Sequence, residues 1–180
     1  MPGELPALVE VDVRRVVPSD WPAVRSLRLE ALQDTPTAFC ERAADAVRAP
    51  DADWQARAAR GAVGGDSFQV LARERDLPIA TAVGFLDGTG DGTGRDAVLA
   101  AVYVTPARRG VHLLDRLVEQ VSAWAVEQGA PRLRLLVHER NERARRAYER
   151  LGFVPTGHTE PYPLDPSARE VELARPLPPA

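Results

Sequence analysis

The sequence predicts an α/β fold in which helices flank one mixed, mostly antiparallel sheet, and three observations carry this prediction. The chain has 180 residues, 44% hydrophobic and 27% charged, which suits one compact domain that buries roughly 70% of the surface its unfolded form exposes. Strand-like and helix-like segments follow the order β-α-α-β-β-β-α-β-α-β-β without internal repeats. The segment 97–104, AVLAAVYV, is apolar throughout and is expected at the centre of the sheet, covered on both faces.

Periodicity and end signals delimit the individual elements. Apolar and β-branched runs bounded by Gly and Pro indicate strands, and apolar positions at helical spacing behind a capping residue indicate helices. Strands are predicted at 9–17, 67–74, 79–87, 97–104, 131–138, 153–157 and 167–177, with a flexible loop at the Gly-rich stretch 88–95. Helices are predicted at 20–33 (cap Ser19 or Asp20), 54–60 (cap Asp51 or Asp53), between Thr105 and the stop Gly129, and at 141–151 (cap Asn141).

Composition excludes several classes of protein and site. A formal charge of -3 and a pI near 5.7 argue against nucleic acid as the main partner, which needs a basic face. Cys40 is the only cysteine, so neither an intramolecular disulfide nor a multi-cysteine metal site can form, and no metal is expected.

The ends of the chain carry no targeting signal that we recognise. Neither a signal peptide in the first twenty residues nor a run of about 18 apolar residues is present, so we expect a cytoplasmic protein with no membrane partner. The predicted domain covers 9–177, with flexible termini at 1–8 and 178–180.

A candidate anion site follows the central strand. After 97–104 the chain passes through Arg109-Gly110 and enters a helix. Free backbone N–H groups converge at such a helix start, at the positive end of the helix dipole. A pyrophosphate would fit there, although most helix starts bind only water.

Two segments resemble one known family. The stretch 141–153, NERARRAYERLGF, resembles the pattern N-x-x-A-x-x-x-Y-x-x-x-G-F of the GNAT acetyltransferases, and VYVTPARRGVHLLDRLVEQVSAWA, from Val102, resembles their strand, R-G-x-G-x-G/A loop and helix. The segment 25–39 is similar to the first helix region of many bacterial members. The resemblance implies an N-acetyltransferase that uses acetyl-CoA as co-substrate and acetylates a primary amine of a small molecule or peptide.

The resemblance also implies where the co-substrate binds. In this fold the strands 97–104 and 131–138 splay apart at their C-terminal ends, and pantetheine adds to the first of them like a further strand. Backbone groups of that strand and of the following loop would hold pantetheine and pyrophosphate, and Asn141 would cap its helix and touch the pantetheine arm. The implied residues are Val102, Tyr103, Val104, Arg109, Gly110, Val111, His112, Leu113, Leu114 and Asn141.

Tyr148 is the implied general acid, which protonates the departing CoA thiolate; the competing interpretation is an aromatic core residue beside Phe153. The family has no single position for the base that deprotonates the amine. Glu30 and His138 are our candidates, chosen from a wider set of groups that are otherwise interpreted as solvated surface residues. That set also contains Asp34, Glu41 and Glu139, and Cys40 as an acyl-carrying nucleophile ranks below all of them.

The loop departs from the family pattern at two positions. His112 stands where the second Gly is usual, and Leu114 where a third Gly or Ala is usual. Gly allows close backbone approach and conformations that a Cβ resists. His112 could still donate to phosphate, but Leu114 is expected to crowd the pyrophosphate, so the loop is expected to bind CoA more weakly, in a modified geometry or not at all. The alternative function is therefore a degenerate GNAT domain that acts as a binding or regulatory module. The acceptor pocket is expected between the first two helices and a late hairpin near 158–166, and a homodimer is left open.

Overall fold

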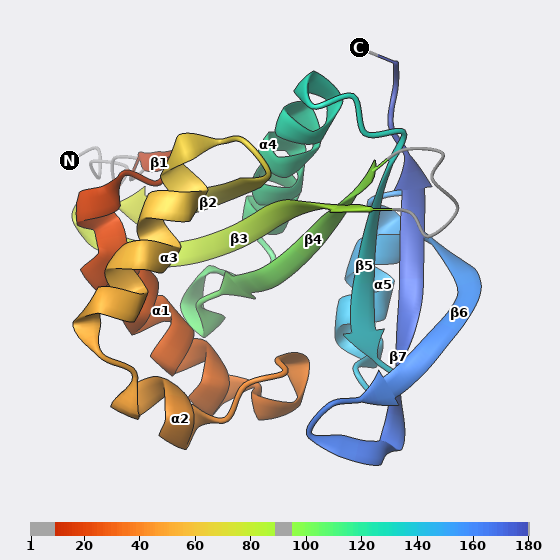
Figure 1. Cartoon of the computed structure of the whole chain (residues 1–180), viewed down its shortest axis with the longest axis horizontal. Helices are drawn as coiled ribbons and strands as arrows, with labels where there is room; N and C mark the ends of the chain where they lie inside the picture. The colour runs from red at the N-terminus through yellow and green to blue at the C-terminus, as the bar shows by residue number, and fades with distance from the viewer. Residues whose placement is uncertain (1–9, 89–94, 180) are drawn as a thin grey trace, which may run out of the picture.

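A computed structural model describes residues 10–88 and 95–179 of the chain. Over these residues a seven-stranded sheet has the order β1-β2-β3-β4-β5-β7-β6, with helices on both faces (Figure 1), so the predicted α/β fold with a mixed sheet is confirmed. The strands are β1 (Val11–Arg15), β2 (Ser67–Glu74), β3 (Leu77–Gly88), β4 (Arg95–Val104), β5 (Arg132–His138), β6 (Val154–Tyr162) and β7 (Asp165–Pro176). The predicted flexible stretches 1–8 and 89–94, and Ala180, lie outside the described residues.

The helices cover the two faces in separate groups. One apolar core joins α4 and α5 to the sheet, and a second core lies under α1 and α3 on the opposite face, as Figure 1 shows. The helices are α1 (Trp21–Asp34), α2 (Ala43–Arg48), α3 (Asp51–Val63), α4 (Leu113–Glu127) and α5 (Glu142–Arg150), with the 3-10 turns η1 (Pro18–Asp20), η2 (Pro36–Ala38) and η3 (Pro106–Arg108). Within the described residues, no helix combines the length and apolar character that crossing a bilayer requires.

Several local predictions need correction. The short helix α2 was not predicted, because its six residues are too few to show a period. Helix α3 begins after Pro50, with no side-chain cap, and runs beyond the predicted 54–60. Asp20 does occupy the N-cap position of α1, but its side chain does not cap the helix; it accepts hydrogen bonds from Arg14, Arg73 and the Val17 N–H instead.

The central strand and its neighbour diverge as expected. β4 is the fourth strand of the seven, and it pairs in parallel with β5 only at Ala97↔Leu133 and Val98↔Arg134. Beyond these pairs β5 continues alone on this side while it pairs with β7 along its whole length. The C-terminal half of β4 therefore presents a free edge to the gap between the two strands.

A β-bulge interrupts the pairing of β4 with β3, in the same half of β4 that has the free edge on its other side. Thr81 lies opposite Tyr103 and Val83 lies opposite Ala100, so the single residue between Thr81 and Val83 faces two on β4. Ala101 has a φ of 50°, a left-handed conformation that costs a non-Gly residue on the order of 1 kcal/mol or more. The bulge leaves one residue outside the regular ladder and bends the strand at this place.

Candidate active site

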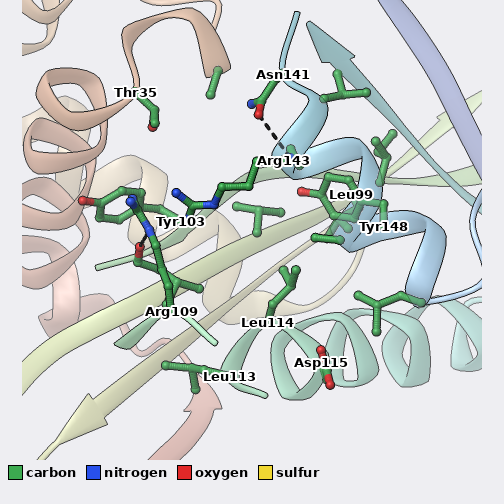
Figure 2. A pocket seen from close by; sticks show the side chains of 18 of the residues that line it. Thr35, Leu99, Tyr103, Arg109, Leu113, Leu114, Asp115, Asn141, Arg143 and Tyr148 are labelled. Carbon is green, nitrogen blue, oxygen red and sulfur yellow. Dashed lines mark hydrogen bonds between the residues drawn. The ribbon is translucent and has the colours of Figure 1, made fainter. Parts of the chain in front are cut away.

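A cleft of about 660 Å³ occupies the gap between the splayed strands. Its walls come from β4, β5, the start of α4, the inner side of α5 and η2 (Figure 2). Eleven predicted site residues line it: Val102, Tyr103, Val104, Arg109, Gly110, His112, Leu113, Leu114, His138, Asn141 and Tyr148. The other two lie outside the lining, because Val111 is 60% exposed on the surface and Glu30 lies on α1.

The main chain of β4 offers fewer groups to the cleft than expected. The Thr105 N–H donates to the Ile79 carbonyl at 2.9 Å, and hydrogen-bonded pairs recur at every second residue of an antiparallel ladder. The N–H and C=O of Tyr103 therefore point toward β3, which corrects the expectation for its main chain. Val102 and Val104 face the free edge, and the Val104 carbonyl accepts a hydrogen bond from Arg109 Nε at 2.9 Å.

The loop before α4 has the backbone shape of an anion site despite its missing glycines. Gly110 has a φ of 81° and His112 a φ of 59°, so His112 adopts a left-handed conformation that glycine would adopt without strain. The helix begins at Leu113, whereas the sequence placed its start only after Arg109-Gly110. Its first backbone bond runs from the Arg116 N–H to the His112 carbonyl, so the N–H groups of residues 113–115 have no acceptor within the helix.

Leu114 projects from the first turn of α4 into the cleft (Figure 2), whereas Leu113 is buried in the core. Leu113 thus belongs mainly to the core and reaches the cleft only in part, whereas Leu114 forms part of the cleft wall. That Leu114 crowds a bound phosphate stays a prediction.

The arginines of the loop are already paired with carboxylates. Arg109 forms an ion pair with Asp34 at the end of α1 and lies over the Tyr103 ring, 5.7 Å from its centroid. Arg108 is paired with Glu74 on β2. His112 Nδ1 lies 2.8 Å from Asp115 Oδ2, so carboxylates offset much of the positive charge near the helix start.

A cation on α5, Arg143, was missed by the sequence interpretation. It lines the cleft, and its side chain reaches from α5 across the cleft in Figure 2. Among the described residues it has no ion pair, whereas Arg146 of the same helix pairs with Glu142. The helical period held the signal, because Arg143, Ala147 and Arg150 share one stripe beside Ala144 and Tyr148.

The two motif residues of α5 are placed by local structure. The Asn141 side chain accepts a hydrogen bond from the Ala144 N–H at 3.1 Å, so the N-cap prediction is confirmed. The Tyr148 ring packs edge-to-face on Phe153, with centroids 5.7 Å apart, and its hydroxyl points into the cleft (Figure 2). The ring thus has the core position of the competing interpretation, while the role of the hydroxyl as general acid stays a prediction. Burial raises the pKa of this hydroxyl.

Each of the two candidate bases has a partner that limits it. Glu30 is exposed and accepts a hydrogen bond from the Tyr103 hydroxyl at 3.0 Å. Burial and this hydrogen bond raise the pKa of Tyr103. His138 is buried and lines the cleft, but its Nδ1 accepts the Arg140 N–H at 3.2 Å. A neutral His138 then carries its hydrogen on Nε2 and has no free lone pair for an ammonium proton.

The wider set of candidates is engaged as well. Burial works to raise the pKa of Glu41, but hydrogen bonds from Arg57 and Arg28 outweigh it and lower that pKa. Glu139 accepts the Arg169 N–H at 3.2 Å. Burial, followed by the nearby Glu170 carboxylate, raises the pKa of Cys40 to about 11, so its thiol is protonated at neutral pH and is a poor nucleophile.

The β6–β7 hairpin meets the segment before α2 at the far end of the cleft. The Tyr162 hydroxyl donates to the Phe39 carbonyl at 2.8 Å, and the Tyr162 ring stands edge-on to His138, with centroids 4.9 Å apart. This is the region in which the acceptor pocket was expected. Over residues 10–88 and 95–179, no group of three or more His, Cys, Asp or Glu side chains is gathered closely enough to hold a metal ion.

Comparisons with solved structures identify the same fold in known acetyltransferases. A GNAT-family acetyltransferase from Streptococcus pneumoniae superposes with a TM-score of 0.76 at 17% identity, over 94% of this chain and all of that one. A phosphinothricin acetyltransferase from Sinorhizobium meliloti, solved with acetyl-CoA, gives 0.72 at 15% identity, over 93% and 88%. NAA60 from Arabidopsis thaliana, solved with a bisubstrate analogue, gives 0.70 at 16% identity, over 95% and 100%.

Comparison of sequences leads to the same family. Uncharacterized N-acetyltransferases of Mycobacterium tuberculosis and Mycobacterium bovis are 36% identical over 66 residues, 37% of this chain. The match spans 42% of the length of these relatives. The family model described as "Acetyltransferase (GNAT) family" matches residues 24–153, which is more than half of the chain and includes both motifs. The chain therefore belongs to the acetyltransferase (GNAT) family.

Proposed function

We propose that this protein is an N-acetyltransferase that transfers the acetyl group of acetyl-CoA directly to a primary amine of a small molecule or peptide. One observation carries the proposal: the free edge of β4, the unpaired N–H groups of α4 and the Tyr148 hydroxyl all face one cleft. In acetyl-CoA the pantetheine arm would use the free edge, the phosphates would use the N–H groups, and the leaving sulfur would use the hydroxyl.

The co-substrate would lie along β4 with its phosphates at the start of α4. Val102 and the bulge beside it offer main-chain groups to the pantetheine arm, as an added strand would use them. The N–H groups of residues 113–115 and the helix dipole suit the pyrophosphate. Arg143 supplies a further positive charge from the opposite wall. The arginines of the loop before α4, in contrast, are already paired with carboxylates.

The reaction then consists of the attack of the amine on the thioester and the proton transfers that accompany it. The neutral amine attacks the thioester carbon, a C–N bond forms and the C–S bond breaks. Tyr148 gives a proton to the departing sulfur and regains one from the nitrogen of the adduct, so the products are the amide and free CoA. The raised pKa of Tyr148 keeps its hydroxyl protonated at neutral pH, as a donor requires.

The alternative, a degenerate binding or regulatory module, is less favoured by the geometry. Substitution of the loop glycines has left the left-handed backbone at residue 112 in place and the cleft open at about 660 Å³. The Tyr148 hydroxyl also faces this cleft, which is the position that a proton donor to the leaving sulfur requires.

Titration with acetyl-CoA and an acceptor panel test the proposal. We expect acetyl-CoA to bind by calorimetry and to stabilise the fold, by about 2.7 kcal/mol at a concentration 100 times its Kd. A panel of primary amines, assayed by release of free thiol, should contain at least one substrate. A chain that neither binds acetyl-CoA nor releases thiol with any amine would contradict the proposal and favour the module.

A further inference from the structure

Glu170 is a buried carboxylate beside the acceptor end of the cleft. It lies on β7 and is only 7% exposed. Its position in the sheet is well defined, because it stands directly opposite His138 on β5 and Glu160 on β6. The third side of this carboxylate is covered by the segment between η2 and α2, through Cys40.

The partners of Glu170 are too weak to account for a buried charge. Within the described residues, its only hydrogen-bond donor is the Cys40 thiol, 3.7 and 3.8 Å from its two oxygens, and a thiol is a weak donor. Glu160 faces it across the strands with the same charge, which is unfavourable. Buried carboxylates normally have an Arg, a Lys or several N–H groups as partners. Burial raises the pKa of Glu170, and the negative charge of Glu160 raises it further.

Glu170 is separated from the cleft by a single layer of side chains. His138, its cross-strand partner, lines the cleft, as does Ala38 in η2. Cys40, two residues after Ala38, contacts the carboxylate. The hydroxyl of Tyr162 holds this segment against the hairpin, and Figure 1 shows η2 directed toward the hairpin end of the sheet. A proton from an amine at this end of the cleft would therefore reach Glu170 through this layer, by way of one water.

We propose that Glu170 accepts the proton of the acceptor's ammonium group, in place of Glu30 and His138, an inference that rests on the proposed N-acetyltransferase function. The ammonium ion transfers one proton to the Glu170 carboxylate, which becomes a carboxylic acid, and the amine keeps its lone pair. That lone pair attacks the thioester carbon. After product release, the carboxylic acid returns its proton to solvent.

The arrangement also selects the class of acceptor. Glu170 and Glu160 face one another without a cation between them among the described residues, so an ammonium ion would relieve their repulsion as well as supply the proton. His158 offsets Glu160 only in part, because its Nε2 lies 3.7 Å from Glu160 Oε2 and carries charge only when protonated. The acceptor is thus a cationic primary amine, and neutral hydroxyl or weakly basic aniline acceptors are disfavoured.

The pH dependence of turnover tests Glu170 against a purely structural role. With an amine found in the panel, Glu170→Gln should lower kcat/KM for the amine at pH 7 by about 100-fold, with the KM for acetyl-CoA unchanged. The remaining rate should rise about tenfold per pH unit toward the pKa of the amine, because only free amine then reacts. Glu170→Asp should restore part of the rate and the wild-type profile. Equal pH profiles of Glu170→Gln and wild type would overturn the proposal.

Alkylation of Cys40 supplies a readout that needs no turnover. Without the neighbouring carboxylate, the pKa of Cys40 should fall below about 11, so iodoacetamide should label Glu170→Gln several-fold faster at pH 8.5 than wild type. Glu139→Gln is the matched control, because Glu139 follows β5 and is not among the groups that act on the Cys40 thiol; the rate at which Cys40 is labelled should not change in this variant. Equal rates in Glu170→Gln and wild type would show that Glu170 does not face Cys40 and would overturn the proposal. A wild-type protein inactive toward every amine removes the proposed function; an active one with an unchanged Glu170→Gln profile removes this inference alone.

Discussion

The co-substrate side of the cleft and the acceptor side are built in different ways. On the first, from β4 to α5, the functional groups are mainly backbone N–H and C=O groups and the apolar wall around them. On the second, where α1, η2 and the β6–β7 hairpin meet, they are charged side chains, most of them in ion pairs. Backbone sites leave a local signature in sequence, whereas paired side chains come from distant segments.

The number of residues between two groups in contact differs between the two sides of the cleft. Asn141 caps a helix three residues away, and the His112 backbone shapes the helix that follows it. Cys40 and Glu170 are 130 residues apart, and Tyr103 and Glu30 are 73 apart. A family motif can persist where spacing is local, and a contact between distant segments leaves no fixed spacing to recognise.

Tyr148→Phe tests the one side chain that the co-substrate side would use in chemistry, and we expect the largest effect here. Loss of the hydroxyl should lower kcat by at least about 100-fold, because the departing sulfur loses its proton donor. The ring and its packing on Phe153 remain, so acetyl-CoA affinity by calorimetry should stay within about twofold. Turnover equal to that of wild type would leave Tyr148 as a core residue and would make the co-substrate side purely a binding surface.

Asp20→Asn tests how far the anchoring of α1, the helix whose other end borders the acceptor side, depends on charge. Asp20 is buried and accepts hydrogen bonds from Arg14, Arg73 and the Val17 N–H, so its loss should cost about 3 kcal/mol of unfolding free energy at pH 7. Burial alone would raise the pKa of Asp20, but the hydrogen bonds from Arg14 and Val17 outweigh it and lower the pKa.

The sign of the Asp20 effect with pH follows from that lowered pKa. The stability it contributes is complete above the unfolded pKa of about 3.9 and is lost as pH falls through the lower folded pKa. Denaturant unfolding of wild type and Asp20→Asn should therefore converge in acid. Asp12→Asn, a surface control that pairs with the same Arg14, should change stability by about 0.5 kcal/mol or less. A constant gap from pH 7 to pH 3 would contradict the assigned ionisation.

Arg143→Gln tests whether the co-substrate side also needs a side-chain charge. Removal of this cation should weaken CoA binding about tenfold, as expected for one charged hydrogen bond to phosphate. Arg146→Gln, on the same helix but paired with Glu142, should have no effect. Dephospho-CoA, which lacks the 3′-phosphate, and pantetheine, which also lacks the pyrophosphate, show which phosphate Arg143 contacts. The difference in affinity between wild type and Arg143→Gln should disappear with the ligand that lacks that phosphate. Equal affinities of both variants for CoA would exclude Arg143 from phosphate binding.

Leu114→Ala should give the smallest effect and sharpens the same comparison. Alanine is usual at this place in the family, so removal of the larger side chain from the cleft should raise acetyl-CoA affinity about threefold if Leu114 crowds the phosphates. Val111→Ala is the control, because Val111 lies outside the cleft. Weaker binding by Leu114→Ala would indicate that the leucine packs favourably against the bound co-substrate.

The sequence by itself determined the features that depend on neighbouring residues. Apolarity throughout 97–104 predicted a central strand, the Asn141 spacing predicted a capped helix, and the family motifs predicted a gap between β4 and β5. The first two follow from backbone geometry, because side-chain period and helix capping are set within a few residues, whereas the gap was implied by the resemblance to the family. The existence of α2 and the start of α4 escaped prediction, since local propensity is weakest at short elements and helix ends.

Only the tertiary structure decided which polar groups of the site are free. The Tyr103 main chain points toward β3, and Arg109 is paired with Asp34. Glu30 accepts a hydrogen bond from the Tyr103 hydroxyl, and His138 Nδ1 accepts one from the Arg140 N–H. Glu170 has only the Cys40 thiol as a donor among the described residues. The sequence identified these residues, but it did not show whether their polar groups already have partners in the fold. A lone pair or a charge is free only if no other segment supplies a partner, and the partner is chosen by packing over the whole fold.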